Sequence, residues 1–174
     1  HKYEFFRGDS FQVYVKSPAD ALSLLLQMRI AAMKLPAETS MPVADIRGSI
    51  GIGVVKPPIK DLRTASDEAF ILSGRSFDKM KPGQRLTITC NEKNSTVNLG
   101  LGVLAQFIDY LFQRLTTRQA SVVAELLMKR TQTETARKLK KSQATIHKHI
   151  QSAGWPEVEK LLTDYQLLIN SIEP

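Results

Sequence analysis

A dense group of basic side chains is the feature of this sequence that most directly implies chemistry. Residues 129–148 contain seven Lys or Arg and a single acid, Glu134, so they hold a charge of +6 out of the chain's net +7. Basic side chains that contact phosphates release the counterions condensed on a polyanion, and this release drives binding. The charge therefore predicts a nucleic acid as the partner.

Residues suited to reading bases lie in and just after the same stretch. Ser142 is a good N-cap for a helix that runs to about residue 152, and Ile146 and Ile150, four residues apart, would pack that helix inward. The residues left on its outward face are Gln143, Ala144, His147, Lys148 and Gln151. In a helix-turn-helix such residues meet base edges in the major groove, where Gln can pair with adenine and Lys with guanine. Ser142 and this outward face are the predicted base-reading set.

Four basic neighbours of that helix would hold the DNA backbone. They are Arg137, Lys138, Lys140 and Lys141. Phosphate contacts of this kind fix the register without carrying sequence information. His147 and His149 are interpreted as outward polar residues and not as metal ligands, because no cluster of carboxylates or cysteines accompanies them. One alternative stays open: three short amphipathic helices with a solvated basic face also form packing modules that bind no DNA.

Helix signals place the rest of this unit. Thr116, with Gln119 three residues later, predicts a capping box at the start of one helix. A short helix over Thr131–Leu139 follows, with Ala136 at a point where two helices must approach closely. Lys140-Lys141 then forms the turn before Ser142.

Three parts of this sequence resemble the helix-turn-helix of sigma-factor-like and response-regulator transcription proteins. They are segments 131–139 and 142–150 and the preceding Leu115-Thr116-x-Arg118-Gln119. The resemblance implies that residues 142–150 form the helix that reads DNA. Lys140 stands where the turn of these proteins usually has glycine. We therefore expect a positive φ at this lysine, which costs about 1 kcal/mol.

Strand-like and helix-like patterns alternate through the first half of the chain. Gly8-Asp9 is expected in the turn of a hairpin, and the glycines at 48, 51 and 53 imply close approach of backbones. The expected elements are strands Tyr3–Phe6 and Phe11–Val15, a helix capped by Ser17 from Pro18 to about Leu35, a strand over Ile46–Val55, a helix over Ser66–Met80, a strand over Arg85–Cys90 and a short strand over Thr96–Leu99.

The period becomes helical from Leu101 onward. One helix over Leu101–Leu115 would bridge the two halves, and Gly154-Trp155-Pro156 would open a last helix. The apolar stripe of that last helix either packs on the three shorter helices or forms a dimer contact. The change of period predicts two domains, an α/β domain over residues 1–100 and an all-α helix-turn-helix domain over residues 101–174.

Three short motifs in the first half carry a second resemblance. They are Gly8-Asp9-Ser10-Phe11-Gln12, Ile46-Arg47-x-x-Ile50-Gly51-Ile52-Gly53, and Ala69-Phe70 with Ser73-Gly74-Arg75. They resemble a divergent nucleotidyl-cyclase-type domain and are similar to motifs of small bacterial SatD-type proteins. This resemblance implies a ferredoxin-like, nucleotidyl-cyclase-like α/β sandwich (α+β) that is N-terminally incomplete, with a strand upstream of residue 1. Asp9 is then either a turn former or a ligand of Mg²⁺ bound with a nucleotide, and a small nucleotide is the implied effector.

Composition fits a folded protein, with 43% hydrophobic and 24% charged residues, and no apolar run is long enough to cross a bilayer. We expect a cytoplasmic homodimer that binds double-stranded DNA as a transcriptional regulator, with a sensing or dimerisation domain first, no cofactor and no catalysis. Two alternatives stay open. One is a divergent nucleotidyl cyclase or nucleotidyltransferase with a regulatory helical tail, and the other is a non-catalytic protein-interaction module.

Overall fold

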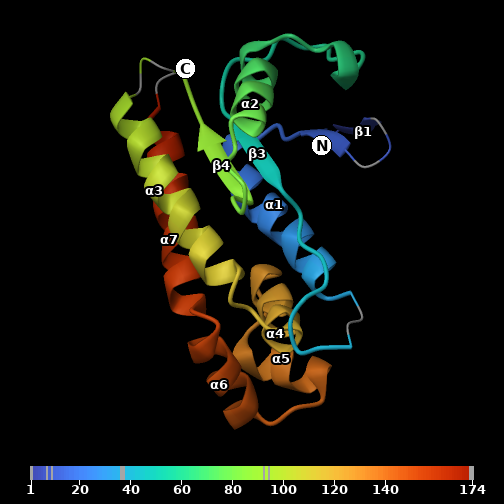
Figure 1. Ribbon diagram of the computed structural model, residues 1–174. Coiled ribbons are helices and arrows are strands. Elements are labelled where there is room, and N and C mark those ends of the chain that lie inside the picture. Colours follow the sequence, from blue (N-terminus) through green and yellow to red (C-terminus); the bar gives the residue numbers. More distant parts are fainter. Residues whose placement is uncertain are drawn as a thin grey trace.

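The computed structural model describes residues 2–6, 8, 10–35, 38–91, 93 and 95–172, and it has a mixed α/β architecture (Figure 1). Its first part holds two small two-stranded sheets with helices, and its second part is helical. The elements are β1 (Lys2–Phe6), β2 (Ser10–Tyr14), α1 (Pro18–Met33), β3 (Gly48–Gly51), the 3₁₀ turn η1 (Leu62–Thr64), α2 (Glu68–Asp78), β4 (Leu86–Thr89), α3 (Ser95–Phe112), α4 (Thr117–Leu127), α5 (Gln132–Leu139), α6 (Gln143–Ser152) and α7 (Trp155–Asn170).

The predicted N-terminal hairpin is confirmed. β1 and β2 pair antiparallel, with Tyr3 opposite Val13 and Phe5 opposite Phe11. Gly8 lies at the tip with φ +76°, a left-handed conformation that favours glycine. Asp9, the predicted turn former or metal ligand, lies outside the described residues.

The second sheet joins β3 and β4 in parallel, and α2 packs on both strands. The predicted close approach is confirmed at Gly51, where an added Cβ would lie 2.2 Å from the carbonyl oxygen of Ala69. The strand is shorter than the predicted Ile46–Val55. It ends at Gly51, opposite the last residue of β4, Thr89, and beyond it the amide of Val54 donates to the Glu68 side chain at 2.9 Å.

Two N-terminal predictions are wrong. Thr96–Leu99 is not a strand but the first turn of α3. The Asn98 side chain fixes this turn, because it accepts a hydrogen bond from the Cys90 amide at 2.8 Å and donates to the Cys90 carbonyl at 3.2 Å. Ser17 precedes α1 but makes no side-chain capping bond; its carbonyl accepts from the Asp20 amide instead.

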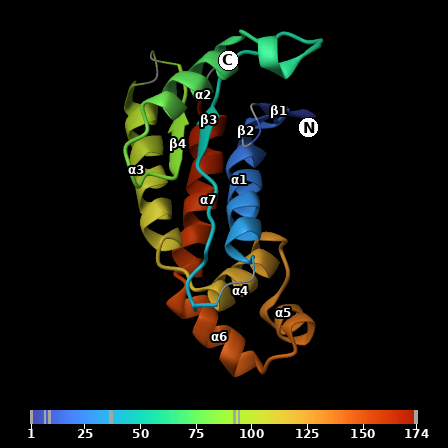
Figure 2. The same cartoon turned by 45° about the vertical axis from the view of Figure 1, so that its right-hand side comes forward.

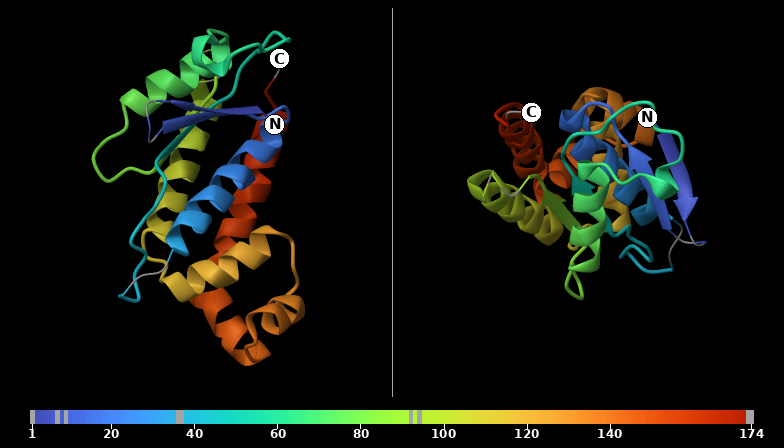
Figure 3. Two further views of the ribbon diagram at one scale, coloured as in Figure 1. Left: turned by 90° about the vertical axis from the view of Figure 1, so that its right-hand side faces the viewer. Right: turned by 90° about the horizontal axis from the view of Figure 1, so that it is seen from above.

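One continuous hydrophobic core runs through the described residues of both halves. Helices α1, α3 and α7 lie side by side, and α4 to α6 cover one end of them (Figure 2). The hairpin and the second sheet lie toward the opposite end (Figure 3). The predicted domain boundary at residue 100 falls inside α3.

The last helix returns along the first one. α7 packs against α1 and α3 as well as against α6, and its Tyr165 is fully buried. The Tyr165 hydroxyl donates to the carbonyl of Pro18, at the start of α1, at 2.7 Å. The apolar stripe of α7 is therefore largely occupied by packing within the chain.

A buried arginine ties four segments together. Arg29 of α1 is fully buried and bonds Asp45 through Nη2 and Asp109 of α3 through Nη1, both at 2.7 Å. The second oxygen of Asp109 accepts from the backbone amides of Arg85 and Leu86 at 2.8 and 2.9 Å. These bonds hold α1, the segment before β3, β4 and α3 in one arrangement. Over the described residues, no helix is long and apolar enough to span a membrane.

Candidate nucleic-acid interface

Local capping signals start the helices of this unit as the sequence predicts. The capping box at α4 is confirmed: the Thr116 amide donates to Gln119 Oε1 at 2.8 Å, and the Gln119 amide donates to Thr116 Oγ1 at 3.3 Å. A second capping box, formed by Thr131 and Glu134, starts α5. Its hydrogen bonds from the Thr131 backbone and side chain lower the pKa of Glu134. The Thr-x-x-Glu spacing that produces this box is visible in the sequence.

The turn between α5 and α6 has the conformation expected of it. Lys140 adopts φ +54°, in the left-handed region, as predicted. This turn lets the Lys141 amide donate to the Ala136 carbonyl at 3.0 Å, which satisfies a terminal acceptor of α5. Ser142 then caps α6 by accepting from the Thr145 amide at 3.1 Å, so its predicted capping role is confirmed.

Packing decides which face of α6 is free. Ile146 is fully buried, Ile150 is partly buried against the core, and Ala136 of α5 is buried where α5 meets α6. The two isoleucines therefore point inward as predicted. All of the predicted outward residues are exposed on α6, namely Gln143, Ala144, His147, Lys148 and Gln151, together with the cap Ser142. Thr145 and Ser152 of this helix are exposed as well.

The predicted phosphate contacts fall into two groups. Arg137, Lys140 and Lys141 are exposed and form no ion pair within the described residues. Lys138 instead reaches back to Glu125 of α4, with its Nζ 2.9 Å from Oε2, although about half of its side chain stays exposed. The first three are free to bind an anion, whereas Lys138 also holds α5 against α4.

Glu125 is the residue of this unit that the sequence did not reveal. Its carboxylate is buried and pairs with both Lys138 and Arg130. Burial alone raises the pKa of Glu125, but the hydrogen bonds and charges of Lys138 and Arg130 outweigh burial and lower the pKa overall. No local sequence pattern predicts the pairing of this residue, because its partners come from a loop and from another helix.

The two histidines that were predicted to be outward differ in their exposure. His147 is exposed and His149 is half-buried. Within the described residues, no group of three or more His, Cys, Asp or Glu could hold a metal ion. The predicted metal ligand Asp9 belongs to the undescribed residues.

No protein-family model, curated protein or solved structure matches this chain. The functional proposal therefore rests on the geometry of α4 to α6. That geometry is a buried scaffold, held by Ile146 and Glu125, which presents a polar helix face beside unpaired basic side chains.

Proposed function

We propose that this protein is a DNA-binding transcriptional regulator that reads double-stranded DNA with α6. The observation that carries the proposal is the orientation of that helix. Ile146 is buried beneath it, while its outward polar residues and the neighbouring basic residues are exposed to solvent. A helix in the major groove needs this division between a packed face and a free face.

The exposed residues that carry this proposal form a base-contacting group and a phosphate-contacting group. Gln143 and Lys148 lie on the outward face of α6 and would contact base edges. Arg137, Lys140 and Lys141, which have no ion pair within the described chain, would contact phosphates. Lys138 contributes less to phosphate binding because Glu125 already neutralises part of its charge.

The α/β part would serve sensing or dimerisation in the cytoplasm. We propose for it the cyclase-like topology that the sequence motifs imply. The β1–β2 hairpin and the parallel β3–α2–β4 unit support this topology, since each is a component of such a domain. A small nucleotide is the proposed effector.

The test is binding to duplex DNA. A duplex selected from a random pool is titrated with protein at several salt concentrations, and affinity should fall steeply as salt rises. Lys148→Ala and Gln143→Ala should each weaken binding to the selected duplex by about 1–3 kcal/mol and relax the sequence preference.

Matched controls come from exposed residues elsewhere in the chain. Lys79→Ala, at the end of α2, and Gln166→Ala, on α7, remove the same side chains away from α6. Both should bind DNA like the wild type. Unchanged affinity and preference in Lys148→Ala and Gln143→Ala would reject α6 as the reading helix.

A further inference from the structure

An apolar stripe follows the exposed face of α3. Leu99, Val103, Phe107 and Tyr110 are between 42% and 71% exposed. Their spacing of four, four and three residues spans eleven residues, which is three turns of an almost straight helix. The four side chains therefore line up along the helix axis and form one surface, which we call the α3 stripe.

The α3 stripe carries no charge. Asp109 is the single Asp, Glu, Lys, Arg or His in α3, and it is buried beneath the helix with Arg29. Charged residues make up 24% of the chain as a whole. A continuous exposed surface that is apolar and uncharged indicates a contact with another macromolecule.

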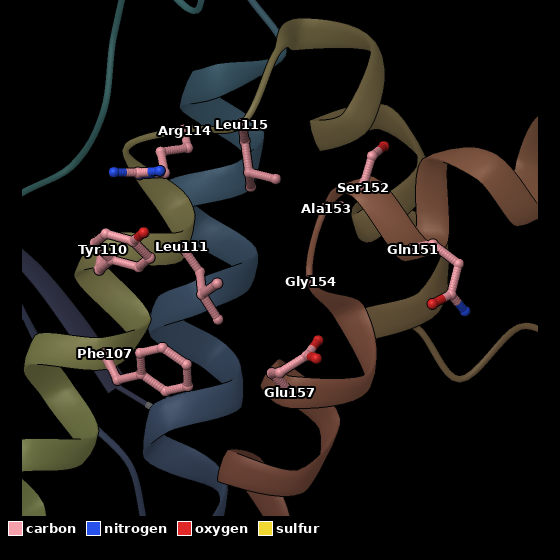
Figure 4. Close-up of a pocket in the computed structure, with 10 residues that line it drawn as sticks. All are labelled: Phe107, Tyr110, Leu111, Arg114, Leu115, Gln151, Ser152, Ala153, Gly154 and Glu157. Carbon is pink, nitrogen blue, oxygen red and sulfur yellow. The ribbon is translucent and has the colours of Figure 1, made fainter.

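A hollow of about 330 Å³ lies at the C-terminal end of the stripe (Figure 4). Phe107 and Tyr110, whose rings stack with centroids 6.2 Å apart, line it from α3. The α6–α7 turn and Glu157 of α7 line its other side. The stripe and the hollow share these aromatic residues and so form one continuous surface.

Two opposite charges border the hollow without pairing to each other. Arg114 stacks over the Tyr110 ring, 4.0 Å from its centroid, and makes no ion pair within the described residues. Glu157 also lines the hollow and has no ion-pair partner in that part of the chain. The surface thus presents a cation and an anion around the hollow, at one end of an uncharged stripe.

We propose that a second copy of this chain covers the α3 stripe, in a two-fold dimer with the two α3 helices side by side. In a two-fold contact each patch meets its own copy. An uncharged stripe then meets an uncharged stripe, and Arg114 of one chain meets Glu157 of the other on both sides of the axis. Two chains of net charge +7 repel each other, and this repulsion is smallest where they meet over an uncharged face.

The orientation of the dimer rests on the proposed DNA binding. Both α6 helices must face one duplex, so the two-fold axis runs along α3 and the two α3 helices are parallel. Figure 1 shows that the C-terminal end of α3 points toward the α4–α6 end of the molecule. The parallel pair therefore places both α6 helices at the same end, as two half-sites of an operator require.

The first experiment measures molar mass in solution by light scattering, over a range of protein concentrations and without DNA. The wild type should be a dimer, and Val103→Glu, in the middle of the stripe, should reduce the mass to that of one chain. Val43→Glu is the matched control, because Val43 is 63% exposed against 60% for Val103 and lies in the segment between α1 and β3. Circular dichroism confirms that each variant is folded.

The second experiment tests the charge pair. Arg114→Glu and Glu157→Arg should each weaken dimerisation at least tenfold, and the double variant should restore it, because the pair is then re-formed with reversed signs. A monomeric wild type, a dimer that survives Val103→Glu, or a double variant that stays monomeric would overturn the proposal. These results are independent of DNA: a dimer that binds no duplex overturns the proposed function alone, and a monomer that binds a single half-site overturns the dimer alone.

Discussion

At the scale of single residues, the turn before α6 combines a favourable charge with an unfavourable backbone. Lys140 is left-handed, with φ +54°, whereas its neighbour Lys141 is not among the residues of positive φ. A side chain with a Cβ is strained in this region, and glycine is not. The lysine is nevertheless exposed, unpaired in the described chain and next to the proposed reading helix.

Lys140→Gly should therefore leave the free energy of unfolding about 1 kcal/mol higher than Lys141→Gly does, because glycine relieves backbone strain only at residue 140. Lys141→Gly is the matched control and should reduce that free energy by about 0.4–1 kcal/mol, because glycine there only adds freedom to the unfolded chain. Urea unfolding measures both changes. If the two glycine variants were equally destabilised, the left-handed turn would be wrong.

At the scale of elements, α6 depends on the capping residue that directly precedes it. Ser142 accepts from the Thr145 amide at 3.1 Å, whereas Ser17, which also precedes a helix and was predicted to cap it, makes no such side-chain bond. The two serines therefore differ in how much they stabilise the helix that follows.

Ser142→Ala should lower the free energy of unfolding by about 1 kcal/mol, the usual effect of removing a capping side chain. Ser17→Ala should change it by no more than about 0.5 kcal/mol, as for exposed residues without a structural bond. Thermal or urea unfolding of both variants decides the point. An equal loss in the two variants would show that the Ser142 hydroxyl is not a cap.

The elements also show which parts of the fold the sequence can predict. Thr116 and Gln119, or Ile146 and Ile150, are three or four residues apart, so a helical pattern reveals them directly. Thr96–Leu99 was wrongly predicted as a strand because the decisive bond joins Asn98 to Cys90, at the end of β4. Short β-branched segments of this kind are settled by such tertiary contacts.

Only part of the proposed interface can be predicted from the sequence, because the rest also depends on tertiary contacts. Five exposed residues of α6 follow from periodicity and could be named beforehand, whereas the exposed Thr145 and Ser152 were not among them. The engagement of Lys138 by Glu125 depends on how α5 packs on α4, and the α3 stripe becomes visible only when packing shows which face of α3 stays uncovered. Neither is encoded in local spacing.

At the scale of the whole molecule, the buried Arg29 links the α/β elements to the long helices. Its partners Asp45 and Asp109 lie 16 and 80 residues away in the sequence. No local pattern could have paired them. Removing the arginine would leave two carboxylates with low exposure facing each other without a cation.

Arg29→Met should therefore destabilise the protein by about 3–5 kcal/mol, as is typical when one member of a buried ion pair is removed. Arg63→Met is the control, since the Arg63 side chain is 62% exposed and pairs with Asp61 at the surface; it should change stability by less than about 1 kcal/mol. Chemical unfolding is followed by far-UV circular dichroism and by the fluorescence of Trp155, the only tryptophan in the sequence.

Because the core is continuous, both signals should shift to lower denaturant together in Arg29→Met. Trp155 lies at the start of α7, next to the proposed DNA-binding unit, whereas Arg29 lies in α1. A Trp155 transition that stays at the wild-type midpoint would show that the two halves unfold separately.

The bond from Tyr165 to Pro18 also constrains how the protein is made. The two residues are 147 positions apart, and the tyrosine is buried where α7 meets α1. While the ribosome is still synthesising the intervening segments, α1 has no α7 to cover it, so its apolar face stays open to water or to chaperones. The native arrangement of α1 can be completed only once α7 has left the exit tunnel.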